Sequence, residues 1–176
     1  MKKYSGLTLV ELLATLAIAG VLVALALPSF RGLMDRRAVE AATADLLADF
    51  SYARAEALKR GHSVTICRSG SGTACEASDG SWHVGWIVFD DLDEDEVVDT
   101  SETVLRVHPA VAGIRSIQKA DGSDAQSTFP YRASGLTPNR SGSLKVLADA
   151  TRPEGWRVLC MSFQGRLSPR PGASAC

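Results

Sequence analysis

An apolar run near the N-terminus limits what this chain can fold into more than any other feature. Residues 7–27 contain one charged side chain, Glu11, and two threonines among otherwise apolar or small residues. The run matches the length of about 20 residues that a helix needs to cross a hydrocarbon core. A carboxylate at the centre of such a helix costs about 2.5–3.5 kcal/mol. An acid inside this run therefore needs a functional explanation.

Three interpretations of the N-terminus compete. Lys2 and Lys3 precede the run, and the positive-inside tendency would leave them in the cytoplasm and the rest of the chain outside. A secretory signal peptide would explain Ala24-Leu25-Ala26, which is similar to a cleavage site, but it would place Pro28 just after the cut. A plain membrane anchor would explain the length of the run but not its acid.

The third interpretation is a resemblance. The leader and "GLTLVELL" resemble the class III signal of type IV pilins and type II secretion pseudopilins. In that family a short basic leader, here residues 1–6, ends in Gly and is removed by prepilin peptidase. The resemblance implies cleavage between Gly6 and Leu7 and N-methylation of Leu7, where the family usually has Phe. It also implies that Glu11 pairs with the amine of an adjacent subunit and that Pro28 bends the helix.

The chain after Pro28 predicts a continued helix. Residues 33–60 contain no Pro and no Gly, and Gly61 follows Lys59-Arg60 as a normal C-terminal stop. Residues 7–28 would form the transmembrane or filament-core half, and residues 29–60 would pack one apolar face on a sheet. Apolar side chains recur at helical steps of three and four residues. They are Val39, Ala42, Leu46, Phe50, Ala53 and Ala57.

Residues 61–176 predict a β-rich globular domain. Short apolar runs alternate with segments rich in Gly, Ser, Asp and Pro, which is typical of strands and turns. The expected strands are residues 63–67, 86–89, 103–107, 114–117, 144–147 and 156–163. One long helix followed by about six to eight strands is an α+β pattern. The resemblance implies a type IV pilin-like fold, in which the helix packs on antiparallel sheet, with two sheets as one form of it.

Four cysteines lie beyond the apolar run. If that run carries the chain out of the cytoplasm, disulfides are the expected state of these cysteines. Three pairings are possible, and we predict the local one, Cys67 with Cys75 and Cys160 with Cys176. A zinc site is less favoured because the spacings are not CxxC and the three histidines show no ligand spacing.

The resemblance extends past the N-terminus. The stretches "ARAEALKRGHSVTIC", "GWIVFDD" and "FPYRASGLTPNRSGSLKV" are similar to the GspH/FimT/FimU group of minor pseudopilins and minor pilins. Membership would imply other major and minor pilins, prepilin peptidase and an inner-membrane assembly platform as partners. It would also imply a single-pass inner-membrane protein with a periplasmic domain, which enters a filament. No enzyme motif such as G-x-S-x-G is present, and we expect no required cofactor.

The C-terminal part of the chain is basic. Residues 132–176 contain seven Lys or Arg and two acids. DNA-binding minor pilins of the FimT type carry a C-terminal GRxR motif, and here Gly165-Arg166-Leu167-Ser168 lacks the second Arg. Arg170 lies two residues later, and phosphates need reachable positive charge rather than a fixed register. The candidates for double-stranded DNA are Arg140, Lys145, Arg166 and Arg170, and the alternative is an ordinary solvated loop.

An acidic stretch lies between two expected strands. Residues 90–102 contain eight acids and no base. Oxygen ligands fall at the positions of an EF-hand calcium loop, where Glu96 replaces the usual Gly and strands replace the flanking helices. The candidate ligands are Asp91, Asp93, Asp95, Asp99 and Glu102. The alternative is a plain acidic hairpin tip, although calcium would relieve the repulsion among these acids.

These observations favour a structural subunit over an enzyme. We expect a minor pilin or pseudopilin that acts in assembly or priming, or at the tip of a type IV pilus or type II secretion pseudopilus. One alternative is a secretion pseudopilin that contacts cargo, and a second is a DNA-capturing minor pilin for natural transformation. A third is a membrane-anchored or secreted β-rich binding protein without a role in a filament.

Overall fold

The computed structural model describes most of the chain. The described residues are 8–76, 80–119, 121, 125–138, 142–149, 151, 155–162, 164–170 and 176. The side chains of residues 24–29 are not described. Gly6, Leu7 and Arg140 lie outside the described residues, as does the side chain of Pro28. The chain divides into two compact units, Met1–Met34 and Asp35–Cys176.

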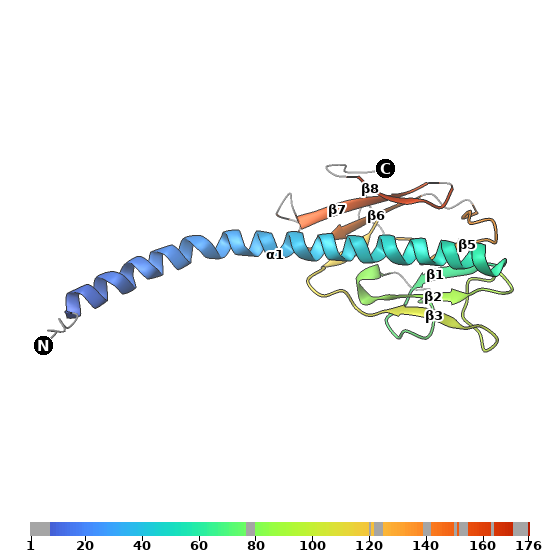
Figure 1. The fold of residues 1–176 in the computed structure, drawn as a ribbon, viewed down its shortest axis with the longest axis horizontal. Helices are drawn as coiled ribbons and strands as arrows, with labels where there is room; N and C mark the ends of the chain where they lie inside the picture. The colour runs from blue at the N-terminus through green and yellow to red at the C-terminus, as the bar shows by residue number, and fades with distance from the viewer. Residues whose placement is uncertain are drawn as a thin grey trace, which may run out of the picture. The chain divides into compact units, whose positions relative to one another are not determined.

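A single long helix, α1 (Leu9–Arg60), contributes to both units (Figure 1). It continues through Pro28, and the bend expected there stays a prediction. It ends where the sequence predicts, because the N–H of Gly61 donates to the carbonyl of Ala57 and Gly61 adopts a φ of 73° that suits glycine. Over the described residues, no helix reaches the length and apolar character that crossing a membrane requires.

The second unit combines the C-terminal half of α1 with two antiparallel four-stranded sheets. The first sheet has the order β3-β2-β1-β5, and the second has the order β4-β6-β7-β8. In Figure 1, β6, β7 and β8 lie along one side of this half of α1, and β1, β2 and β3 lie along the other. The elements after α1 are β1 (Val64–Arg68), the 3₁₀ turn η1 (Trp82–Val84), β2 (Trp86–Asp90), β3 (Val104–His108), β4 (Ser116–Gln118), β5 (Thr128–Tyr131), β6 (Gly142–Leu147), β7 (Trp156–Met161) and β8 (Leu167–Arg170).

The core lies where the helical pattern predicts. All six apolar positions of the expected stripe on α1, from Val39 to Ala57, are at most 1% exposed. They pack with apolar side chains of both sheets into one cluster. Phe50 of α1 meets Trp82 at 5.8 Å and Phe129 at 5.2 Å between ring centroids, which is within the range of favourable aromatic pairs.

The expected strands all form, with shifted ends, and two further strands appear. The sequence did not predict β5 (Thr128–Tyr131) or β8 (Leu167–Arg170). Each pairs on one side only, β5 with β1 and β8 with β7, so each is the edge of its sheet. The expected fourth strand at residues 114–117 is present as β4 (Ser116–Gln118).

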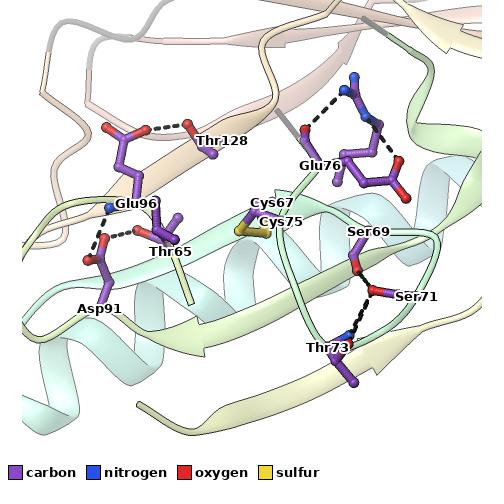
Figure 2. Close-up of a disulfide and its surroundings, with 12 residues drawn as sticks. Thr65, Cys67, Ser69, Ser71, Thr73, Cys75, Glu76, Asp91, Glu96 and Thr128 are labelled. Atoms are coloured by element: carbon purple, nitrogen blue, oxygen red, sulfur yellow. Dashed lines mark hydrogen bonds and ion pairs between the residues drawn. A yellow bond between two sulfur atoms is a disulfide. The ribbon is translucent and has the colours of Figure 1, made fainter. Parts of the chain in front are cut away.

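The cysteines form the local pairs, Cys67–Cys75 and Cys160–Cys176. The first disulfide closes a loop after β1 (Figure 2), and Cys67 is buried against Ile87 and Phe89. Arg68 helps to hold the same loop, because its buried guanidinium donates to the carbonyls of Gly80 and Glu76 at 2.7 and 3.0 Å. The second disulfide ties the C-terminal residue to β7.

Candidate functional site

Glu11 closes a hydrogen-bonded cap at the start of α1. Its Oε2 accepts from the backbone N–H and the hydroxyl of Thr8 at 2.9 and 2.8 Å, and the Thr8 hydroxyl accepts from the N–H of Glu11 at 3.3 Å. This reciprocal pattern is a capping box, which the T-x-x-E spacing could have revealed. The cap holds the Glu11 carboxylate beside Thr8, the residue that follows Leu7, where the cleaved chain is expected to begin. Pairing of Glu11 with the amine of another subunit stays a prediction.

The first turns of α1 expose apolar side chains on all sides. An isolated helix of this kind is stable only where something apolar surrounds it, such as lipid or neighbouring helices. Nine apolar residues between Leu9 and Val23 are between 50% and 74% exposed. They are Leu9, Val10, Leu12, Leu13, Leu16, Ile18, Val21, Leu22 and Val23. This surface is the part of the first unit best suited to assembly.

In the second unit, a buried carboxylate fastens α1 to the first sheet. Asp49, which is 4% exposed, accepts from the indole N–H of Trp86 at 2.8 Å and from the guanidinium of Arg106 at 2.7 Å. Arg106 lies over the ring of Tyr52 at 3.8 Å, and His108 stacks on Trp86 at 3.9 Å between centroids. These contacts fix β2 and β3 against the helix, so both ends of the loop between these strands are held in place.

That loop contains the acidic residues. Among the described residues, Asp91, Asp93 and Asp95 form a group in which one carboxylate oxygen of each lies within 4.8 Å of the others. Glu96 has a φ of 65°, the left-handed conformation that an EF-hand obtains with Gly at this position. Its N–H donates to Asp91, and its carboxylate accepts from the hydroxyl of Thr128 (Figure 2). The missing Gly is thus compatible with the turn.

The other two candidate calcium ligands form hydrogen bonds within the loop. Asp99 accepts from the N–H and hydroxyl of Ser101 at 2.7 and 2.6 Å, and Glu102 accepts from the N–H of Leu92 at 2.7 Å. The structure therefore groups three of the five predicted ligands. Calcium binding stays a prediction. Calorimetry with millimolar calcium chloride tests it, and an absence of heat would reject it.

Protonation of the loop is shaped by burial. Burial raises the pKa of the Asp91 carboxyl, although the hydroxyl of Thr65 donates to it at 2.5 Å. Burial also raises the pKa of Glu102, whereas hydrogen bonds from Ser101 lower the pKa of Asp99. A raised carboxyl pKa favours the protonated form of Asp91 in the folded state. The free energy of unfolding therefore falls as the pH rises from the unfolded pKa of Asp91 through its folded pKa. A cation beside Asp91 would remove that penalty.

The basic candidates fall on two different surfaces. Lys145 of β6 and Arg170 of β8 both pair with Val158 of β7, so they share one row across the second sheet. Lys145 also lies 4.8 Å from the ring of Trp156. Arg166, in contrast, precedes β8 and lines a cavity beside α1 together with Arg54. The structure thus brings Lys145 and Arg170 into one row and separates Arg166 from them.

Arg54 was not among the residues that the sequence singled out. A signal for it exists, because the residues three and four positions away on the helix are Phe50, Ser51, Ala57 and Leu58. None of these is acidic. Neighbouring cations on α1 do have such partners: Lys59 and Arg60 both pair with Glu56. Arg54 therefore lacks the acidic partner one turn away that would stabilise it on the helix.

Comparisons with known families match both parts of the chain. The family described as "Type II transport protein GspH" matches residues 42–165. The "Prokaryotic N-terminal methylation motif" matches residues 1–27. A search of curated proteins finds no match.

Two of the similar solved structures have the same fold. Two crystal forms of the type IV minor pilin FimU from Pseudomonas aeruginosa are similar to this chain. One is 20% identical with a TM-score of 0.58, and covers 79% of this chain and 92% of FimU. The other is 21% identical with a TM-score of 0.56, and covers 75% and 92%. The minor pseudopilin EpsH of the type 2 secretion system of Vibrio cholerae, at 12% identity, covers 77% of this chain and 98% of EpsH with a TM-score of 0.47.

Proposed function

The chain belongs to the GspH family, and from this membership we propose that it is a minor pilin or pseudopilin that acts in filament assembly. Pilins and pseudopilins are structural subunits that associate with one another after prepilin processing. One observation carries the proposal: the methylation motif on residues 1–27 and the family region on residues 42–165 occur in one chain. A β-rich binding protein without a filament role would need the second feature but not the first.

The position that we propose is the priming complex or the tip of the filament. The chain would be inserted in the inner membrane with its globular unit in the periplasm, and an assembly platform would then add it to a filament. The apolar surface of the first turns of α1 supports this proposal, because such a surface suits lipid first and neighbouring helices later. Glu11 would neutralise the amine of a neighbour during the transfer.

Intact mass spectrometry of the mature protein tests the first step. We expect a chain that begins at Leu7 and carries one N-methyl group. A methylated amine keeps its positive charge, so it remains a partner for Glu11. A mature chain that begins at Leu27, as a secretory signal peptide predicts, would rule out the proposal.

A second function, binding of double-stranded DNA, is supported by the row of Lys145 and Arg170 on the second sheet. Two cations in one row can reach successive phosphates, and the ring of Trp156 lies beside Lys145. Contacts of this kind are independent of sequence, weak for one subunit and sensitive to salt. Under this proposal the chain is a DNA-capturing minor pilin.

Gel shifts with the full-length protein and a double-stranded oligonucleotide test this second function. We expect a shift at low salt that disappears as salt rises and is lost in the double variant Lys145→Gln/Arg170→Gln. Arg36→Gln is the matched control, because it removes one exposed cation from α1, where Arg36 pairs with Glu40. No shift by the unmodified protein at low salt would end the hypothesis.

A further inference from the structure

A cavity of about 360 Å³ opens where the two sheets meet α1. Its walls come from α1, from Tyr131 at the end of β5 and from the start of β8, so edge strands of both sheets contribute. The apolar part of the lining includes Phe50 and Leu58 of α1 and Leu167 of β8. Two cations, Arg54 and Arg166, line it as well, and no acidic side chain is among its described lining residues.

The wall opposite α1 is held in a defined shape. The hydroxyl of Tyr131 donates to the carbonyl of Gly165 at 2.9 Å, which joins the two sheets. Gly165 has a φ of 74°, and a Cβ there would lie 2.8 Å from the ring of Tyr131. Burial raises the pKa of Tyr131, so its phenol stays protonated and remains a donor. The turn is held further because the N–H of Ser162 donates to the carbonyl of Arg166 at 3.0 Å and the N–H of Gly165 donates to the carbonyl of Ser162 at 2.9 Å.

The two guanidinium groups of the cavity carry positive charge that the described part of the chain does not neutralise. Other arginines of the unit do have carboxylate partners, such as Arg60 with Asp90 at 2.8 Å and Arg132 with Glu94 at 2.6 Å. Arg54 and Arg166 form no ion pair with any described acid. Two guanidinium groups without an ion-pair partner, beside apolar side chains, suit a planar carboxylate. Arginine binds such a carboxylate through two parallel hydrogen bonds.

We propose that this cavity docks an acidic segment of a neighbouring pilin or pseudopilin subunit, an inference that rests on the proposed function. A Glu or Asp of the neighbour would lie between Arg54 and Arg166, and an adjacent aliphatic side chain would contact the apolar wall. Leu58, which is 54% exposed, provides an apolar rim beside Arg54, and a Cβ added at Gly135 would lie 3.1–3.2 Å from these two side chains. A centre of arginine and apolar side chains is typical of the residues that dominate protein interfaces.

The shape of the cavity favours a protein segment over a nucleic acid. The phosphates of a duplex lie on a convex surface, and they need outward-facing cations rather than an apolar hollow. Lys145 and Arg170 offer such cations on the sheet, away from α1. The cavity instead combines charge with the apolar side chains of Leu58 and Leu167, as a mixed acidic and aliphatic segment requires.

Photo-crosslinking of the full-length chain in cells that assemble the filament tests the proposal. Benzoylphenylalanine replaces Leu58 at the rim, and mass spectrometry identifies the cross-linked peptide. We expect a peptide of another pilin or pseudopilin with Asp or Glu close to the cross-link. A synthetic copy of that peptide should bind the purified full-length protein at least about tenfold more weakly after Arg54→Gln or Arg166→Gln. Arg36→Gln, the control, removes a cation of α1 that does not line the cavity and should leave the affinity unchanged.

The outcomes separate this proposal from the proposed function. If the chain enters sheared filaments but Leu58 cross-links to no pilin, only the docking proposal is wrong. Equal binding of the peptide by all variants would also reject it. If Arg54→Gln weakens the gel shift with DNA but not the cross-link, the cavity belongs to nucleic acid and the proposal is overturned. If the unmodified chain is absent from filaments, both proposals fall together.

Discussion

Replacing Asp49 by Ala should lower the free energy of unfolding of the protein by about 2–4 kcal/mol. The substitution leaves the fully buried indole N–H of Trp86 without its acceptor and removes the charge-assisted bond from Arg106. The side chain of Arg106 is 43% exposed, so its guanidinium can regain water and the greater part of the loss comes from Trp86. Urea denaturation of the full-length protein, followed by tryptophan fluorescence, measures the change.

Asp45→Ala is the matched control for this experiment. Asp45 lies one turn earlier on the same helix and is half exposed, and its contact with His108 is longer, at 3.4 Å. Its removal should cost less than about 1 kcal/mol, as is usual for exposed pairs. Equal losses for the two variants would mean that Asp49 does not fasten the helix to the first sheet.

Replacing Glu11 by Val should reduce incorporation into filaments by at least about tenfold, because an unneutralised amine would then be buried among apolar helices. The cap on Thr8 complicates this test, since Val removes the charge and the cap together. Glu11→Gln separates the two, because Gln can still accept from the N–H of Thr8 but carries no charge. Immunoblots of sheared filaments measure incorporation.

We expect Glu11→Gln to fail nearly as badly as Glu11→Val. Thr15→Val is the control: its hydroxyl donates only to the carbonyl of Leu12 among the described residues, so its loss should leave incorporation intact. Normal incorporation of Glu11→Gln would show that the cap, and not the charge, is what assembly needs from this residue.

Much of the fold could be predicted from local pattern. The stripe from Val39 to Ala57 identifies the buried face of α1, because a 3.6-residue period leaves few alternatives. The two missed strands contain Pro130 and Pro169, and proline argues against a strand unless the strand lies at an edge. Edge position is a property of the assembled sheet, so the sequence alone did not reveal it.

The candidate sites divide in the same way. The acidic loop could be found from spacing, since its ligands are close in the chain, whereas the row of Lys145 and Arg170 depends on strand register. The cavity depends on a meeting of Arg54 with Arg166, residues far apart in the sequence. Only the missing acid one turn from Arg54 was visible beforehand.

The prolines in the two edge strands, Pro130 and Pro169, also protect such subunits against aggregation through their sheet edges. A free sheet edge presents backbone donors and acceptors that invite a strand from another molecule. Pro130 in β5 and Pro169 in β8 each remove one donor from strands only four residues long. Under the proposed function, subunits that are concentrated at a membrane would therefore be less prone to amyloid-like pairing at these edges. Under the same proposal, filament growth would instead depend on α1 and would begin only after the leader is cleaved.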